Sequence, residues 1–272
     1  MIHASFFELI RISAALACGC LLVCVCHGDD GHPSATLSAL KADRILILGN
    51  SITLHGIWPE GGWKIYCGMA ASAPEKDYVH LLVAGLDDRT GGHLHLSPTD
   101  PAKAPSIDGA NVVNIADILE RQYPTYTNAR LQWQIDYKPD IVVLQFGENM
   151  DRAAFKPDAF RTALRALMNG LRDASNPHIF VTSMLLGDGG PIDPIKREIC
   201  AEDPSHRVFV DLSAFPQDPK NFASAEPFYT GVITGHPGDH GMSVIADGLL
   251  KAMVAVGDGQ GTPATDAGAG GK

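Results

Sequence analysis

Four short runs of mostly apolar residues stand out along the chain, and in none of them do apolar and polar residues alternate. They occupy residues 45–48, 141–146, 179–182 and 208–210. Runs of this length without alternation are typical of strands buried on both faces, as in parallel sheets. The pattern therefore predicts a sheet that other elements cover on both sides.

Between these runs, apolar residues recur at helical spacing. Helices are predicted from Ser72, whose Ser72-Ala73-Pro74-Glu75 segment has the form of a capping box, and at about 115–123, 195–201 and 241–254. Another begins at Pro157 and ends at Asn176-Pro177. Strands that alternate with helices predict a doubly wound, mainly parallel sheet in a three-layer α/β/α sandwich. We interpret residues 28–256 as one such domain.

The two ends of the chain differ from this domain. Arg11 precedes an apolar run over residues 12–26 that is short for a membrane span, so residues 1–27 are interpreted as a signal peptide. A membrane anchor, a lipid anchor and a buried helix are the alternatives. Residues 257–272 are mostly Gly, Ala, Thr and Asp, a composition typical of a disordered tail. We expect a secreted or periplasmic protein, and a lipid-anchored form of it is the alternative.

Composition excludes one class of partner. The formal net charge is -10, and no cluster of Lys or Arg stands out, whereas binding to a phosphate backbone needs concentrated positive charge. Nucleic acid is therefore not expected as a partner.

Outside the predicted signal only Cys67 and Cys200 remain. An exported location permits a disulfide between them, and two free buried thiols fit equally well.

Polar side chains follow two of the predicted strands and precede the last helix. The segments are Gly49-Asn50-Ser51, Gly147-Glu148-Asn149 and His236-Pro237-Gly238. In a parallel sheet the carboxyl ends of the strands share one edge, which is where open α/β sheets bind ligands. A serine, a carboxamide and an imidazole at one edge are the minimum set of groups for acyl transfer. The alternative for Ser51 is that it caps a helix.

These three segments resemble sequence blocks of the SGNH (GDSL-like) hydrolase superfamily, in the family's order. Gly49-Asn50-Ser51-Ile52-Thr53 resembles the first block, with Asn50 in place of the commoner Asp, and Gly147-Glu148-Asn149 resembles the third. The segment from His236 to Gly241 resembles the last block. The resemblance implies a flavodoxin-like fold and ester hydrolysis without a cofactor. It assigns Ser51 as nucleophile, His236 as general base and Asn149 to the oxyanion hole.

The chain departs from the family pattern in three places. Met150 replaces the usual Asp after Asn149, and Ile233 stands where the family has an aspartate that orients the histidine. We therefore expect a Ser–His dyad, or orientation of His236 by a backbone carbonyl or by another acid, with Glu148, Glu226 and Asp239 as candidates. The family's second block, a glycine that donates its N–H to the oxyanion, has no clear match. Gly68 is our candidate and Gly109 the next, and both also fit as ordinary turn glycines.

Other polar and aromatic residues leave alternatives open. His93 and His95 fit either metal ligands or solvated loop residues, and Pro237 and Gly238 between His236 and His240 argue against a helical zinc site. We therefore expect neither a metal nor a cofactor. Trp58 and Trp63 fit a platform for a sugar ring and equally a lid on the core.

The sequence favours an exported serine esterase that removes O-acetyl groups from carbohydrates. Its partner would then be a small-molecule or glycan ester. Thr53 excludes the nucleophile elbow of α/β-hydrolases, which has glycine two residues after the serine. The alternatives are a lysophospholipase or thioesterase, and a non-catalytic glycan-binding protein of the same fold. The oligomeric state is not predicted.

Overall fold

Five parallel strands form the centre of the protein in a computed structural model, which describes residues 40–90, 94, 112–227 and 231–259. Their order across the sheet is β2-β1-β3-β4-β5, and every neighbouring pair is parallel. The predicted parallel sheet is confirmed. The strands are β1 (Ile45–Gly49), β2 (Val112–Asn114), β3 (Ile141–Gln145), β4 (His178–Thr182) and β5 (Arg207–Val210).

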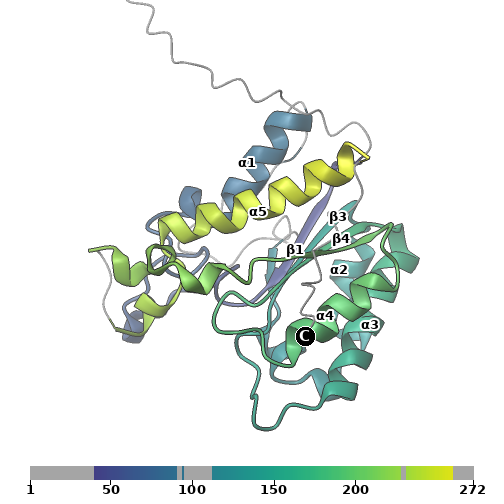
Figure 1. Cartoon of the computed structure of the whole chain (residues 1–272), viewed down its shortest axis with the longest axis horizontal. Coiled ribbons are helices and arrows are strands. Elements are labelled where there is room, and N and C mark those ends of the chain that lie inside the picture. Colours follow the sequence, from purple (N-terminus) through teal and green to yellow (C-terminus); the bar gives the residue numbers. More distant parts are fainter. Residues whose placement is uncertain (1–39, 91–93, 95–111, 228–230, 260–272) are drawn as a thin grey trace, which may run out of the picture. The chain divides into compact units, whose positions relative to one another are not determined.

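Helices cover both faces of the sheet, as Figure 1 shows. Successive side chains of β1 enter different cores, Ile45 and Ile47 on one face and Leu46 and Leu48 on the other. The three-layer α/β/α architecture is therefore confirmed. The first face is covered by α1 (Tyr78–Thr90) and α5 (Asp239–Gly257), and the second by α3 (Pro157–Ser175) and α4 (Ile192–Ala201), with the short α2 (Gln132–Asp136) beside them.

A glycine brings the two helices of the first face close together. A Cβ atom on Gly85 of α1 would lie 2.8 Å from Cδ2 of Leu250 in α5. Gly85 lowers the intrinsic helix propensity of α1, but the absence of its side chain gives Leu250 room to pack. Figure 1 shows α1 and α5 side by side along the sheet.

Two predicted helices differ from the observed elements. The Ser72 capping box does not form, because both the N–H and the hydroxyl of Ser72 donate to the Asp239 carboxylate at 2.7 Å. The chain instead makes a 3-10 turn at Pro74–Lys76, and α1 begins only at Tyr78. The helix predicted near 115–123 is a π-helical turn at Ala116–Glu120 followed by a 3-10 turn at Tyr123–Thr125.

The two cysteines lie in different layers. Cys67 belongs to the core beneath α1 and α5, and Cys200 to the core on the opposite face. Both are buried free thiols, so they do not form the disulfide that the sequence permitted. The predicted signal and most of the predicted tail lie outside the described residues, as do His93 and His95. No helix in the described part of the chain is long and apolar enough to cross a membrane.

Candidate active site

Ser51 lies in a tight turn directly after β1. The turn starts at Gly49, where a Cβ atom would lie 1.8 Å from Oγ1 of Thr53 and 2.7 Å from the carbonyl oxygen of Gln145. Glycine is therefore required for the approach to the neighbouring strand. Residues 51–53 form turns and no helix starts at Ser51, so the capping role considered from the sequence does not apply.

The buried side chain and carbonyl of Asn50 hold this turn in shape. The Asn50 carbonyl accepts hydrogen bonds from the N–H groups of Thr53 and Leu54, at 3.1 and 3.0 Å, and Oδ1 accepts one from the N–H of Ile52 at 3.0 Å. The N–H of Ser51 donates no hydrogen bond within the described residues. It is therefore free to act as a donor to a ligand.

His236 lies beside Ser51, although 185 positions separate the two residues in the chain. Ser51 Oγ and His236 Nε2 are 3.1 Å apart, within hydrogen-bond distance. Two backbone hydrogen bonds hold the histidine loop: Ala223 N–H donates to the carbonyl of His236 at 2.9 Å, and Gly238 N–H to that of Asn221 at 3.0 Å. The structure thus brings together the hydroxyl and the imidazole that the sequence singled out.

The second ring nitrogen of His236 has no carboxylate partner among the described residues. Nδ1 is buried and makes no hydrogen bond to any of them. Its polar neighbours are the backbone carbonyls of Val232 and Ile233, which raise the pKa of the imidazole. Burial, the largest effect, and the electrostatic interaction with His55 act more strongly in the other direction, so the pKa of His236 lies below its ordinary value. The imidazole is therefore neutral at neutral pH, as a general base requires.

The three acids considered as orienting groups have other surroundings. Glu148 accepts hydrogen bonds from Asn50, Gln145 and the Leu185 N–H. Asp239 binds Ser72 and forms an ion pair with Lys76 at 2.8 Å. Glu226 Oε2 is buried with no hydrogen-bond partner among the described residues, and its carboxylate packs against Gly238. None of the three is hydrogen-bonded to His236.

Asn149 follows β3, the strand that pairs with β1. Gly49 and Gln145 are register partners, so Ser51 and Asn149 both lie just beyond the same end of adjacent strands. The carboxamide of Asn149 is held at both of its ends. Nδ2 donates to Glu120 Oε2 at 2.7 Å, and Oδ1 accepts a hydrogen bond from Arg121 at 3.2 Å. One of the two Nδ2 hydrogens remains without a partner in the described structure.

Gly68 does not present its N–H to this site. The Gly68 N–H donates to the Asp77 carboxylate at 3.0 Å, and a Cβ atom at this position would lie 2.4 Å from the carbonyl oxygen of Ile52. Gly68 is therefore required for close packing against the Ser51 turn, and its N–H is not available to an oxyanion because it is bound to Asp77. The other candidate, Gly109, lies outside the described residues.

Two glutamates accept hydrogen bonds from Asn50: Glu120, which is buried, and Glu148, which is half-buried. Asn50 Nδ2 donates to Glu120 Oε1 at 3.1 Å and to Glu148 Oε2 at 2.5 Å. Burial raises the pKa of Glu148, Lys196 lowers it, and the negative charge of Glu120 raises it further. An aspartate at position 50 would place a third carboxylate between these two acids, whereas the amide of Asn50 supplies a hydrogen to each.

The two tryptophans considered as a sugar platform have different positions. Trp63 is 1% exposed and belongs to the core, so it acts as a lid. Trp58 is 38% exposed, and its ring lies 6.1 Å from that of His55. His55 in turn interacts electrostatically with His236.

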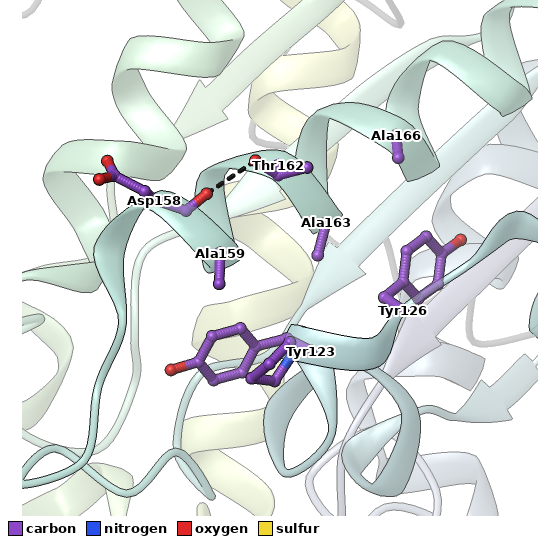
Figure 2. A pocket seen from close by; sticks show the side chains of 8 residues that line it. Tyr123, Tyr126, Asp158, Ala159, Thr162, Ala163 and Ala166 are labelled. Atoms are coloured by element: carbon purple, nitrogen blue, oxygen red, sulfur yellow. Dashed lines mark hydrogen bonds between the residues drawn. The ribbon is translucent and has the colours of Figure 1, made fainter.

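The described residues contain no group of three or more His, Cys, Asp or Glu side chains that could hold a metal ion. A surface pocket lies elsewhere, between the Tyr123–Thr125 turn and α3 (Figure 2). Thr162 closes one side by donating to the carbonyl of Asp158 at 2.8 Å. None of the residues that line this pocket contacts Ser51, Asn149 or His236 through a hydrogen bond in the described structure. They are Tyr123, Pro124, Tyr126, Asp158, Ala159, Thr162, Ala163 and Ala166.

Sequence reasoning missed two residues of the site. Glu120 lies in a turn whose pattern resembles an amphipathic helix, and nothing local marks it as a buried acid. His55 lies four residues after Ser51 in a glycine-rich loop, and this proximity in sequence was the one available signal.

Comparison with known proteins adds little to this geometry. No family model matches the chain, and no curated protein matches it. Among solved structures, the chain is similar to a two-domain esterase (CEX) active on acetylated mannans, co-crystallised with mannopentaose, with a TM-score of 0.46 and 15% sequence identity. The similarity covers 84% of this chain and 53% of that one, so the chain spans about half the length of that esterase.

Proposed function

We propose that the protein is a serine esterase with Ser51 as its nucleophile and His236 as its general base. The observation that carries this proposal is the 3.1 Å approach of Ser51 Oγ to His236 Nε2 at the carboxyl edge of the sheet. A hydroxyl is a weak nucleophile until a base takes its proton. The lowered pKa of His236 keeps the imidazole neutral and able to do so.

The reaction proceeds in two halves. Ser51 Oγ attacks the ester carbonyl carbon while His236 Nε2 takes the hydroxyl proton, and a tetrahedral oxyanion forms. Collapse of this intermediate breaks the bond to the alcohol, which leaves with the proton from His236. Water then attacks the acyl-serine with His236 again as base, and the carboxylate product is released as Ser51 regains its proton.

The oxyanion requires preorganised donors. The two that we assign are the Ser51 N–H and the unpartnered Nδ2 hydrogen of Asn149, both unused by other described groups. Because no carboxylate in the described part of the chain holds His236 Nδ1, we propose that the enzyme works as a Ser–His dyad. The carbonyls of Val232 and Ile233 then provide the favourable interaction with the imidazolium.

For the substrate, we propose a carbohydrate carrying O-acetyl groups. The exposed face of Trp58, next to His55, offers an aromatic surface of the kind on which sugar rings pack. A second candidate is an ester with a longer acyl chain, as in a lysophospholipase or thioesterase. It is favoured by the exposed apolar side chains Ile57 and Val232, which are 43% and 65% exposed. We also propose that residues 1–27 direct export.

The test compares the wild type with Ser51→Ala and His236→Ala on p-nitrophenyl esters from acetate to decanoate and on acetylated xylan. We expect acetate release that depends on both residues, and labelling of Ser51 by a fluorophosphonate. Faster turnover of long-chain esters would favour the second candidate. Equal rates for wild type and Ser51→Ala, with no labelling of Ser51, would overturn the proposal. The remaining alternative would then be a non-catalytic glycan-binding protein.

A further inference from the structure

Glu120 is a buried acid that accepts every hydrogen bond it makes. Its side chain is 1% exposed. Oε1 accepts hydrogen bonds from Asn50 Nδ2 at 3.1 Å, from the Gly147 N–H and from the Asn149 N–H at 3.4 Å, and Oε2 accepts one from Asn149 Nδ2 at 2.7 Å. Both side-chain oxygens of Glu120 thus act as hydrogen-bond acceptors, for four donors in all.

These contacts join the two segments that carry the proposed chemistry. Asn50 precedes Ser51 in the turn after β1, and Asn149 lies in the loop after β3. No other side chain in the described part of the chain is hydrogen-bonded to both Asn50 and Asn149. Glu120 thus fixes the position of one loop relative to the other from the turn that follows β2.

The same contacts decide which way the Asn149 carboxamide faces. A carboxamide has a donor end and an acceptor end of nearly the same shape, so only its neighbours select the orientation. Here Glu120 accepts from the donor end and Arg121 donates to the acceptor end, at 2.7 and 3.2 Å. If the carboxamide rotated by about 180°, its oxygen would face the Glu120 carboxylate and its NH₂ group would face the Arg121 guanidinium. Both contacts would be unfavourable.

We propose that Glu120 is a positioning residue that locks the Asn149 carboxamide with one N–H free for the oxyanion. This deepens the proposed function and rests on it for its kinetic consequence. The structural part, that Glu120 sets the carboxamide orientation, stands independently of any activity.

Glu120→Gln is the informative substitution, because it keeps the size of the side chain and reverses the polarity at one oxygen. The new NH₂ group faces donors whichever way it points: Asn149 Nδ2 on one side, or Asn50 and Gly147 on the other. We expect the carboxamide of Asn149 to rotate or move away in order to avoid this donor–donor contact. We expect kcat on p-nitrophenyl acetate to fall by about 10²–10³-fold, as for loss of one oxyanion donor, with KM changed by less than about threefold.

A double-mutant cycle separates positioning from general damage. If Glu120 acts through Asn149, then Glu120→Gln lowers kcat in the wild type but has almost no further effect in Asn149→Ala. Full additivity of the two losses would overturn the proposal. The matched control is Glu198→Gln on the exposed side of α4, where Glu198 pairs with Arg161, and for which we expect wild-type kinetics.

A second measurement does not depend on catalysis. The side-chain amide resonances of Asn149, assigned by their loss in Asn149→Ala, should shift in Glu120→Gln and stay unchanged in Glu198→Gln. Unchanged Asn149 resonances in Glu120→Gln would overturn the positioning role. If the proposed function itself is wrong, wild type and Ser51→Ala hydrolyse esters equally, while the resonance result still decides the role of Glu120.

Discussion

Replacing Asn149 with alanine tests the oxyanion hole directly. The wild-type carboxamide uses one Nδ2 hydrogen on Glu120 and leaves the other without a described partner, so the substitution removes one donor from the oxyanion. One such donor is typically worth about 2.7–4 kcal/mol in the transition state, and we therefore expect kcat to fall by about 10²–10³-fold. KM should change little, because the donor acts mainly on charge that develops in the transition state.

The same substitution has a separate effect on stability. Glu120 Oε2 loses its donor in a buried place, and a buried acceptor left without a partner costs about 1–3 kcal/mol. Urea unfolding should show this loss as a lower midpoint with an unchanged slope. We therefore expect the Asn149→Ala protein to be folded, with a somewhat lower free energy of unfolding and a much lower kcat.

Steady-state hydrolysis of p-nitrophenyl acetate at pH 7.5, normalised by fluorophosphonate titration of Ser51, measures the effect. Asn149→Asp provides the comparison, because it keeps the shape, loses the donor and adds a negative charge beside the oxyanion. Its loss of kcat should be at least as large. If folded Asn149→Ala turned over within fivefold of the wild type, the assignment of Asn149 as an oxyanion donor would be refuted.

Three further substitutions test other parts of the structure. His55→Gln removes an electrostatic interaction that helps to lower the pKa of His236. That pKa should rise, and the acid limb of the kcat/KM profile should move to higher pH. An unmoved acid limb would contradict this coupling. Asn50→Asp places a third carboxylate between Glu120 and Glu148. The folded-state pKa of this new acid is then raised above its unfolded value. We therefore expect the free energy of unfolding to fall by about 3–5 kcal/mol at pH 8, and by less as the pH approaches 5 and the acid becomes protonated. Urea unfolding at both pH values measures this difference. In α1, the side chain introduced by Gly85→Val should overlap Leu250 and lower the free energy of unfolding by about 1–3 kcal/mol, as measured by thermal unfolding. Gly85→Ala should lower it by less, because its Cβ meets only the mobile end of the Leu250 side chain.

Four of the five strands were predictable because they carry a strong local signal, whereas β2, three residues long and not fully buried, was not among the predicted runs. A strand that is buried on both faces must be apolar throughout, as residues 45–48 and 141–144 are, and no tertiary contact is needed to recognise it. The ends of α3 were equally clear, since Pro157 begins it and Asn176, with a left-handed φ of 51°, ends it. The approach of Ser51 to His236 followed from the same topology, because parallel strands share one edge.

The rest depends on partners far away in the chain. Ser72 has every local mark of a helix cap, but it binds Asp239, 167 positions later. Gly68 has the freedom that an oxyanion glycine needs, but Asp77 takes its N–H. Glu120 looks like a solvated helix residue, and only the assembled turn reveals that it is buried among donors. Propensity and periodicity are local, so they do not report which distant group takes a hydrogen bond.

The 185-residue separation of Ser51 and His236 has a consequence for how the protein matures. The nucleophile lies just after β1, the first strand of the described sheet, while the base precedes α5, the last described helix. Contacts between such distant segments close late in folding, because the entropy of a long loop must be overcome first. Ester turnover would then report the docking of α5, and during refolding it should return after the circular dichroism of the sheet rather than with it.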